Sequence, residues 1–294
     1  MGPTIFEKQN SSRCLRYLAS QRQIYSNAKK LLTLQIILVV IVVTLLSVIN
    51  YFCKIEWILG SYSAIITLID IFLINKWIDN LKKRAAKIQE KFDTTLFELE
   101  WNDIISQVDE EVVFRYSELY KKKEPNFNSL KNWYSPKIKD IDSDLAKILC
   151  QRTNCVYDFT LRKYYLNTLI FLLAGLGLLV VILGLYQNIS LPNFVNVLVL
   201  PLLPMISFGL QKYQDNQESI ESLNNLKETT EEVWDKVIKG EKIDINKRSR
   251  SIQNRIYLNR KNNPLIFDWL YRIIRSRLEG EMHYSIEQMI KQIK

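Results

Sequence analysis

Residues 31–75 contain two apolar runs that are separated by only four residues. The first run, 31–52, has no charged residue. As a helix it would be about 33 Å long, which is enough to cross a hydrocarbon core of roughly 30 Å. The break at 53–56 follows, and a second apolar run extends to about Asn75. Buried core helices are the alternative, but soluble cores rarely need two such runs back to back. The pattern therefore predicts an antiparallel membrane hairpin.

Charge is segregated along the whole chain. The 294 residues are 48% hydrophobic with a net charge of +9, yet nearly all charge lies outside four apolar blocks. Such segregation is typical of a membrane protein. The blocks lie near 31–52, 56–75, 166–186 and 191–210. The first block follows a long polar segment and is too long for a signal peptide, so we expect an uncleaved anchor. We predict an all-α, four-span transmembrane protein.

The basic residues predict the orientation of these spans. Those that flank the apolar blocks on the side away from the tight connectors are Lys8, Arg13, Arg16, Arg22, Lys29, Lys30, Lys76, Lys82, Lys83, Arg84, Lys87, Arg162, Lys163 and Lys212. The tight connectors 53–56 and 187–190 carry almost no positive charge. Since loops rich in Lys and Arg stay inside, we expect an inner-membrane protein with both termini in the cytoplasm.

This topology divides the chain into five parts. They are a basic amphipathic N-terminal segment (1–30), the hairpin of spans 1 and 2 (31–75), a cytoplasmic helical insert (76–165), the hairpin of spans 3 and 4 (166–210) and a cytoplasmic helical tail (211–294). In the insert, apolar residues recur at steps of three and four from Leu81 to Leu99, which predicts an amphipathic helix continuing the second span. Pro125 marks a loop. Pro136 is expected to open a helix that runs into the third span.

The N-terminal segment and the tail also have helical patterns. Apolar residues between Leu15 and Tyr25 follow helical spacing, so a helix that lies at the membrane interface or docks on the protein is expected. Gly240 is expected to end a helix that extends the fourth span. Pro264 is expected to break a second tail helix, and another helix should begin near Ile266.

Asp70 is the only acidic residue well inside an expected span. Intramembrane carboxylates are costly and usually face a bundle interior or water. Gly60, Ser63, Thr67 and Asp70 recur at steps of three and four, so one face of the second helix is small and polar. This face would suit the lining of a pore between several chains. The alternative is close helix packing through the small residues, with Asp70 reaching toward the cytoplasmic headgroups.

Prolines and glycines mark special positions in the second hairpin. Pro201 and Pro204 each remove a backbone donor from the fourth span, which predicts a kink that serves either as a gating hinge or as a static bend. Gly177 and Gly184 lie two turns apart on one face of the third span. We expect them to form a packing groove.

The tail combines basic and aromatic residues, which makes it the candidate site for a nucleotide messenger. Arginine forks suit phosphates, and aromatic faces suit bases. An alternative is a basic face against anionic lipid, or ion pairs with Glu279 and Glu281. The candidate nucleotide-binding residues are Arg248, Arg250, Arg255, Arg260, Trp269, Tyr271 and Arg272.

Catalysis and metal binding have little support in the sequence. The chain has no Gly-rich phosphate loop and no nucleophile elbow, and His283 is its single histidine, which excludes most acid–base constellations. Cys150 and Cys155 lack the second pair that a zinc site needs. We expect no enzyme activity, no catalytic residues, no bound metal and no cofactor.

Several stretches resemble one known family. They are IFEKQN and LASQRQIYSNAKK near the start, AKIQEKFDTTLFELEWN after the second span, and IQNRIYLNRKNNPLIFDWLYRIIRSRLEGE in the tail. With spans arranged as two, insert, two, the chain resembles the S-4TM family of predicted pore-forming effectors. The resemblance implies a role in bacterial anti-phage systems in which a nucleotidyltransferase makes a cyclic oligonucleotide messenger. The effector then damages the membrane of its own cell.

The expected function is therefore a membrane effector that oligomerises and permeabilises the inner membrane when a nucleotide messenger triggers it. Oligomers are needed because packed helices lie only about 8–10 Å apart, so four spans leave no aqueous path. The alternative is a non-conducting scaffold or sensor that signals through its cytoplasmic helices. The expected partners are membrane lipid, further copies of the chain and a cyclic oligonucleotide. Because membrane topology accounts for the basic charge, no DNA or RNA partner is expected.

Overall fold

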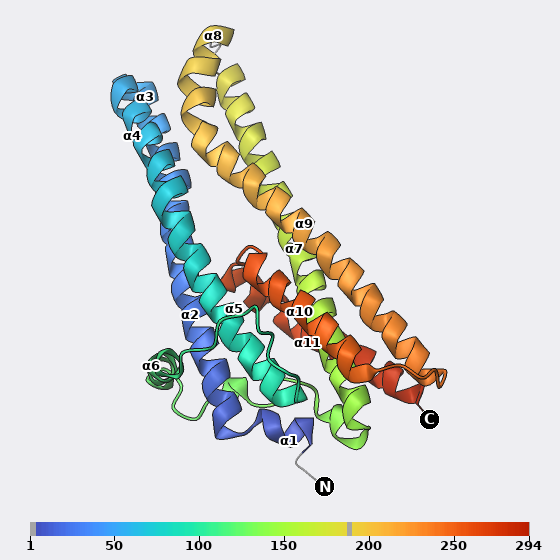
Figure 1. The fold of residues 1–294 in the computed structure, drawn as a ribbon. Helices are drawn as coiled ribbons and strands as arrows, with labels where there is room; N and C mark the ends of the chain where they lie inside the picture. Colours follow the sequence, from blue (N-terminus) through green and yellow to red (C-terminus); the bar gives the residue numbers. More distant parts are fainter. Residues whose placement is uncertain (1–3, 187–189, 294) are drawn as a thin grey trace.

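The computed structural model describes residues 4–186 and 190–293, and every regular element within these ranges is helical. Two long antiparallel hairpins diverge toward one end of the molecule, and the other helices gather at the opposite end (Figure 1). The expected all-α class is confirmed. Both described ends of the chain lie at the end where the other helices gather (Figure 1).

The first hairpin has two nearly continuous arms. The ascending arm consists of α2 (Ser12–Ile36), η1 (Ile37–Val42) and α3 (Val43–Cys53), and the descending arm of α4 (Glu56–Ile69), η2 (Asp70–Ile74) and α5 (Asn75–Phe97). The Ser11 side chain caps α2 by accepting a bond from the Cys14 amide at 3.3 Å. Lys54, in the left-handed conformation, ends α3 at the expected break. Both arms, Ser12–Asn50 and Glu56–Phe97, are long and apolar enough to cross a membrane.

The second hairpin pairs the 44-residue helix α7 with a second arm made of several elements. Its elements are α7 (Ser143–Tyr186), α8 (Leu191–Asn193), η5 (Phe194–Val199) and α9 (Leu200–Ile238). The helices α7 and α9 approach closely at Gly209, where an added Cβ would lie 2.4 Å from a methyl group of Leu173. Gly177 has no such neighbour within 4 Å, and the side-chain position of Gly184 lies outside the described residues. The close packing expected at Gly177 is thus found at Gly209 instead.

The remaining helices flank and join the hairpins. They are α1 (Ile5–Gln9), α6 (Glu110–Lys121), η3 (Asn128–Leu130), η4 (Pro136–Asp140), α10 (Ile245–Asn262) and α11 (Asp268–Lys291). Gly240, with φ +74°, follows the end of α9, and Pro264 follows α10, as expected. The expectation for Pro136 is wrong, because it opens only the short turn η4 and the long helix begins at Ser143. A proline suits either start, since its missing N–H costs nothing in a first turn.

The largest core lies at the end that holds the described termini. It joins α2, α5, α6 and α7 through fully buried residues such as Leu18, Phe92, Phe97 and Cys150. A second core around Trp234 joins α7, α9, α10 and α11. The expected N-terminal segment, insert and tail therefore pack as one helical body. The N-terminal helix docks on this body, one of the two outcomes anticipated from its sequence.

Between the hairpins there is a smaller apolar contact. Val39, Val43 and Ile66 of the first hairpin pack with Leu202 and Met205 of α9. This contact lies in the middle of the apolar blocks. The hairpins are thus joined at mid-height, while their far ends diverge (Figure 1).

Candidate functional site

The outer faces of the hairpins are apolar. In the first hairpin Phe52, Ile65 and Phe72 are more than half exposed, and in α7 Phe171 and Leu185 are more than 70% exposed. An exposed apolar belt of this extent is typical of a surface that faces lipid. Both hairpins carry it, although the length and composition of the described helices single out only the first pair as candidate spans.

Two tryptophans mark the ends of this belt on the descending arm. Trp57 is 76% exposed and Trp77 is 52% exposed. They are separated by twenty positions of one helical arm, or about 30 Å at 1.5 Å per residue. Tryptophans gather at the two membrane–water interfaces, and about 30 Å is the thickness of the hydrocarbon core. Asp70 lies between the two tryptophans, two turns from Trp77.

Asp70 is buried between the two arms of the first hairpin. Its Oδ1 accepts a hydrogen bond from Gln35 Nε2 of α2 at 2.5 Å, and its Oδ2 accepts one from Asn75 Nδ2 at 3.4 Å. The same Gln35 nitrogen donates to Asn75 Oδ1 at 2.9 Å. Gln35 and Asn75 were not among the candidate residues from the sequence. The signal for Gln35 was an amide inside an otherwise apolar run.

Further polar groups continue along the inside of this hairpin. Ser63 Oγ and Asn50 Oδ1 are buried and have no hydrogen-bond partner within the described residues, and the same holds for Gln35 Oε1. Buried polar atoms without partners are costly, especially where no water reaches them. We call Gln35, Asn50, Ser63 and Asp70 the polar track.

The expected pore-lining residues do not share one surface in the single chain. Ser63 and Asp70 face the hairpin interior, and the Thr67 hydroxyl donates to the Ser63 carbonyl at 2.7 Å. Gly60 is exposed, and no atom within 4 Å would meet an added Cβ there. A pore lined by all four residues therefore requires a rearrangement of α4 against α2, or the approach of another chain. The assignment of these four residues to a pore stays a prediction.

The expected hinge residues lie at the start of α9. Pro201 occupies its first turn, and its side chain lies outside the described residues. Pro204 lies inside the helix, which continues past it without a break. The element η5, directly before α9, has wide π-type turns, as do η1 and η2. Such turns are local irregularities that are frequent at functional sites. A gating role for the prolines stays a prediction.

Two buried carboxylates of α5 bind the tail helix α10. Glu90 and Asp93 are both 0% exposed. Arg250 Nη2 donates to Glu90 Oε1 at 2.5 Å, and Arg260 pairs with Asp93. Gln253 Nε2, between them, donates to both carboxylates, at 2.8 Å and 3.0 Å. We call this group the carboxylate clasp.

The clasp also reaches the insert and α7. The Tyr134 hydroxyl donates to Asp93 Oδ1 at 3.0 Å and accepts from Asn154 Nδ2 at 2.8 Å. Burial raises the pKa of Glu90, although Arg250 and Gln253 oppose the shift. Burial is the largest influence on Arg260 and lowers its pKa, but Asp93, Tyr134 and Glu90 together outweigh it, so the pKa is raised. The clasp therefore holds α10 against α5, the last helix of the descending arm.

The candidate nucleotide-binding residues are not gathered in one site. Arg250 and Arg260 belong to the clasp. Arg248, Arg255 and Arg272 are exposed, and Arg255 donates to the Thr229 hydroxyl at 3.3 Å. The Tyr271 ring lies under the guanidinium groups of Arg22 and Arg275, and Trp269 stacks on Phe267. The expected alternative of ion pairs with Glu279 and Glu281 is not found for these residues, because Glu279 pairs with Arg275 and Glu281 with Arg277. Arg250 and Arg260 are instead used for internal ion pairs with carboxylates of α5.

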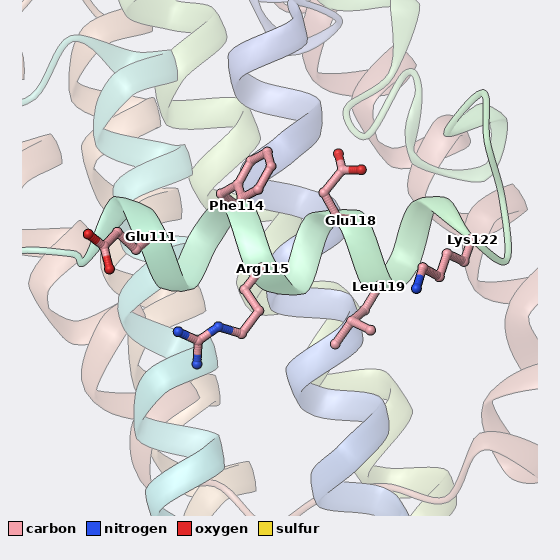
Figure 2. A pocket seen from close by; sticks show the side chains of 6 residues that line it. All are labelled: Glu111, Phe114, Arg115, Glu118, Leu119 and Lys122. Carbon is pink, nitrogen blue, oxygen red and sulfur yellow. The ribbon is translucent and has the colours of Figure 1, made fainter.

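A small polar cavity of about 250 Å³ lies where the hairpins meet the tail. Asn75 and Asp79 line it from the first hairpin, Lys212 and Asp215 from α9, and Pro264 from the loop before α11. The neighbouring Lys82 bonds the Asn262 carbonyl at 3.2 Å. The cavity thus lies between the tail and both hairpins, beside Asn75, which bonds Asp70. A second hollow, of about 380 Å³, lies on the outer face of α6 (Figure 2).

Comparison with known proteins identifies the family. The model of the SMODS-associating 4TM effector domain matches residues 3–289. The chain belongs to this family. The resemblance found in the sequence is confirmed. Together with the two helices able to span a bilayer, this membership establishes a membrane protein.

A curated relative gives a second likeness. The chain is 26% identical over 294 residues to a protein of Bacillus cereus strain VD146 that is named a probable CBASS effector molecule, and the match covers 95% of each chain. No solved structure matches the chain.

Proposed function

We propose that this protein is the membrane-damaging effector of a bacterial anti-phage system that signals through cyclic oligonucleotides. When a messenger binds, several chains assemble and permeabilise the inner membrane. Family membership and the name of the Bacillus relative support the defence role. The buried polar track inside an apolar hairpin is the observation that carries the permeabilising role, because lipid-facing helices do not otherwise retain such groups.

The proposed topology has four spans, with both termini in the cytoplasm. The apolar belt on both hairpins supports four spans, and the common end of the two termini supports a single side for both. The helical body with the carboxylate clasp then lies in the cytoplasm, where a messenger is made. The proposal assigns the chain no catalytic step.

The proposed mechanism links the tail to the polar track through α5. Because α5 and α4 form one arm, a shift of α5 against α2 strains the bond between Asp70 and Gln35. Freed from Gln35, Asp70 would form a ring of carboxylates between chains, which favours the passage of cations. The exposed Arg248 and Arg255, seven residues apart on α10, are the groups that we assign to the messenger's phosphates.

Reconstituted liposomes test this proposal. Dye release should require both the protein and one member of a panel of cyclic oligonucleotides. In planar bilayers with a salt gradient, Asp70→Asn should reduce the preference for cations, because it keeps the shape and removes the charge. Glu241→Gln, an exposed acid in the loop after α9, is the matched control and should leave the reversal potential unchanged. A chain that binds messenger without any leakage would instead support a non-conducting sensor. Equal reversal potentials in wild type and Asp70→Asn would remove Asp70 from the conduction path.

A further inference from the structure

Helix α6 lies crosswise to the long helices of the first hairpin. Its inner side is anchored in the core through the buried Val113 and Ser117, with Tyr116 and Tyr120 packed beside them. Figure 1 views the helix end-on beside α2, and Figure 2 shows it crossing in front of α2 and α5. Its other side points away from both hairpins. This outer face is therefore open to a neighbour in the same membrane.

The outer face carries two acids, two bases and two apolar side chains. They are Glu111, Phe114, Arg115, Glu118, Leu119 and Lys122 (Figure 2). Phe114 is 59% exposed and Leu119 is 40% exposed. Glu118 has only a loose ion pair with Lys121, at 3.9 Å. Glu111 in the first turn of α6 and Lys122 at its end also suit the dipole of the single helix.

The arrangement is symmetric about the point between Tyr116 and Ser117. Glu111 and Lys122 are equally distant from this point, as are Arg115 and Glu118, and each of these pairs joins an acid and a base. Phe114 and Leu119 form a third equidistant pair, which is apolar. Reversing the direction of the helix therefore exchanges acid for base and apolar for apolar. A face with this property is complementary to itself.

We propose that two copies of this chain pair through α6, antiparallel and about a twofold axis. In that register Glu111 comes level with Lys122 of the second copy, and Arg115 comes level with Glu118 of the second copy. Each contact occurs twice by symmetry. The level pairs have opposite charges, so both ionic positions are attractive.

The orientation of α6 agrees with the constraint that a membrane imposes. Two copies with the same orientation in one bilayer are related by a twofold axis along the membrane normal. Such a rotation keeps long helices parallel and reverses any helix that lies in the membrane plane. Because α6 lies crosswise to the spanning helices, the rotation makes its two copies antiparallel (Figure 1). The sequence symmetry of the outer face matches this requirement.

The patch is too small to hold two soluble proteins together by itself. Confinement in a membrane raises the effective concentration of the chains, so a weak contact is sufficient. The contact is charged and exposed, and it therefore weakens as salt rises. Pairing through α6 would serve the assembly step, and this role rests on the proposed function. The geometry of the pair does not depend on that function.

A charge exchange tests the pairing. Chains are labelled with donor or acceptor dyes at Cys53, which is exposed while the other three cysteines are buried. Energy transfer is then measured in liposomes against the protein-to-lipid ratio, with and without messenger. Arg115→Glu and Glu118→Arg alone each place like charges level at two positions. Each should raise the ratio for half-maximal transfer roughly tenfold. An equal mixture of the two variants restores opposite charges at both positions and should return to the wild-type ratio.

The exchange separates pairing from misfolding, because a misfolded variant is not rescued by mixing. Lys242→Glu, a charge reversal in the exposed loop before α10, is the matched control and should behave as wild type. Single variants that pair like wild type overturn the inference, as does a mixture that fails to recover while circular dichroism is unchanged. Dye release separates the two proposals. If mixing the variants rescues pairing but no dye is released, only the proposed function is refuted. If the single variants release dye and their energy transfer equals that of wild type, only the pairing through α6 is refuted.

Discussion

Arg260→Ala should release the tail helix α10 from α5. Arg260 supplies the positive charge that pairs with Asp93, a carboxylate with no exposed surface. After the substitution Asp93 keeps two neutral donors, the Tyr134 hydroxyl and the Gln253 amide. Its charge is left buried without a counter-ion. The loss should therefore exceed that of an ordinary hydrogen bond.

The size of the effect follows from the burial of the pair. Removing one partner of a buried ion pair costs about 3–5 kcal/mol. The two remaining donors place this case at the lower end, at about 3 kcal/mol. Since about 1.4 kcal/mol corresponds to a factor of ten, the opening of α10 should become roughly 100-fold more favourable.

Hydrogen–deuterium exchange of the protein in nanodiscs measures this opening. Protection of the amides of α10 and of the facing turns of α5 should fall by roughly the same factor. Arg255→Ala is the matched control, because Arg255 lies on the exposed side of the same helix with one bond to Thr229. It should change protection less than about threefold.

A second substitution tests the cause. Asp93→Asn in the Arg260→Ala background removes the buried charge and should recover at least half of the lost protection. Protection that is unchanged in Arg260→Ala, or equally reduced in Arg255→Ala, would refute the clasp as the lock on α10. A double variant no better than Arg260→Ala would refute the uncompensated charge as the reason.

Three further predictions concern the core, the pH dependence and the topology. Leu18→Ala empties a fully buried position of the largest core and should destabilise it by about 2–5 kcal/mol, measured as earlier cleavage in a thermal proteolysis series. Burial raises the pKa of the Glu90 carboxyl in the folded protein. Glu90 therefore stabilises the fold at pH values below its ordinary pKa, and this stabilisation is lost as the pH rises through the raised pKa. The hydrogen-exchange protection of the α10 amides should accordingly fall with rising pH in wild type more than in Glu90→Gln. Parallel pH profiles of protection in the two proteins would contradict this. Alkaline phosphatase, which is active only outside the cytoplasm, should be active when it is inserted after Lys54 and inactive when it is fused after Lys294. The reverse pattern would overturn the proposed topology.

Local rules were enough to predict many helix boundaries. The end of α9 near Gly240 and the end of α10 before Pro264 depend on residues that end helices wherever they stand. The break between α3 and α4 was indicated instead by the charged Lys54 and Glu56 between two apolar runs. Pro136 was harder to interpret, because a proline suits the first turn of a long helix and of a short turn equally well. Packing against the rest of the fold decides whether a long helix continues after such a proline.

The candidate sites show where sequence reasoning stopped. It identified Asp70 as costly within an apolar arm, but it did not find Gln35, which lies 35 positions earlier and meets Asp70 only when the hairpin closes. It grouped Arg250 and Arg260 with the exposed arginines of the tail. Their carboxylate partners lie about 160 positions away on α5, and no local spacing indicates such pairs.

The sequence by itself determined the helical class and the hairpins, because hydrophobic length, helix periodicity and turn chemistry act over a few residues. The family followed from the resemblance of several stretches of the chain to one known family. Only the tertiary structure decided which polar groups are free to act. Burial sets the cost of a charge, and partners from distant helices set whether that cost is met. The same distinction holds for α6. The order of its charges is written in the sequence, but only the fold anchors its inner side in the core and leaves the outer side facing a neighbour.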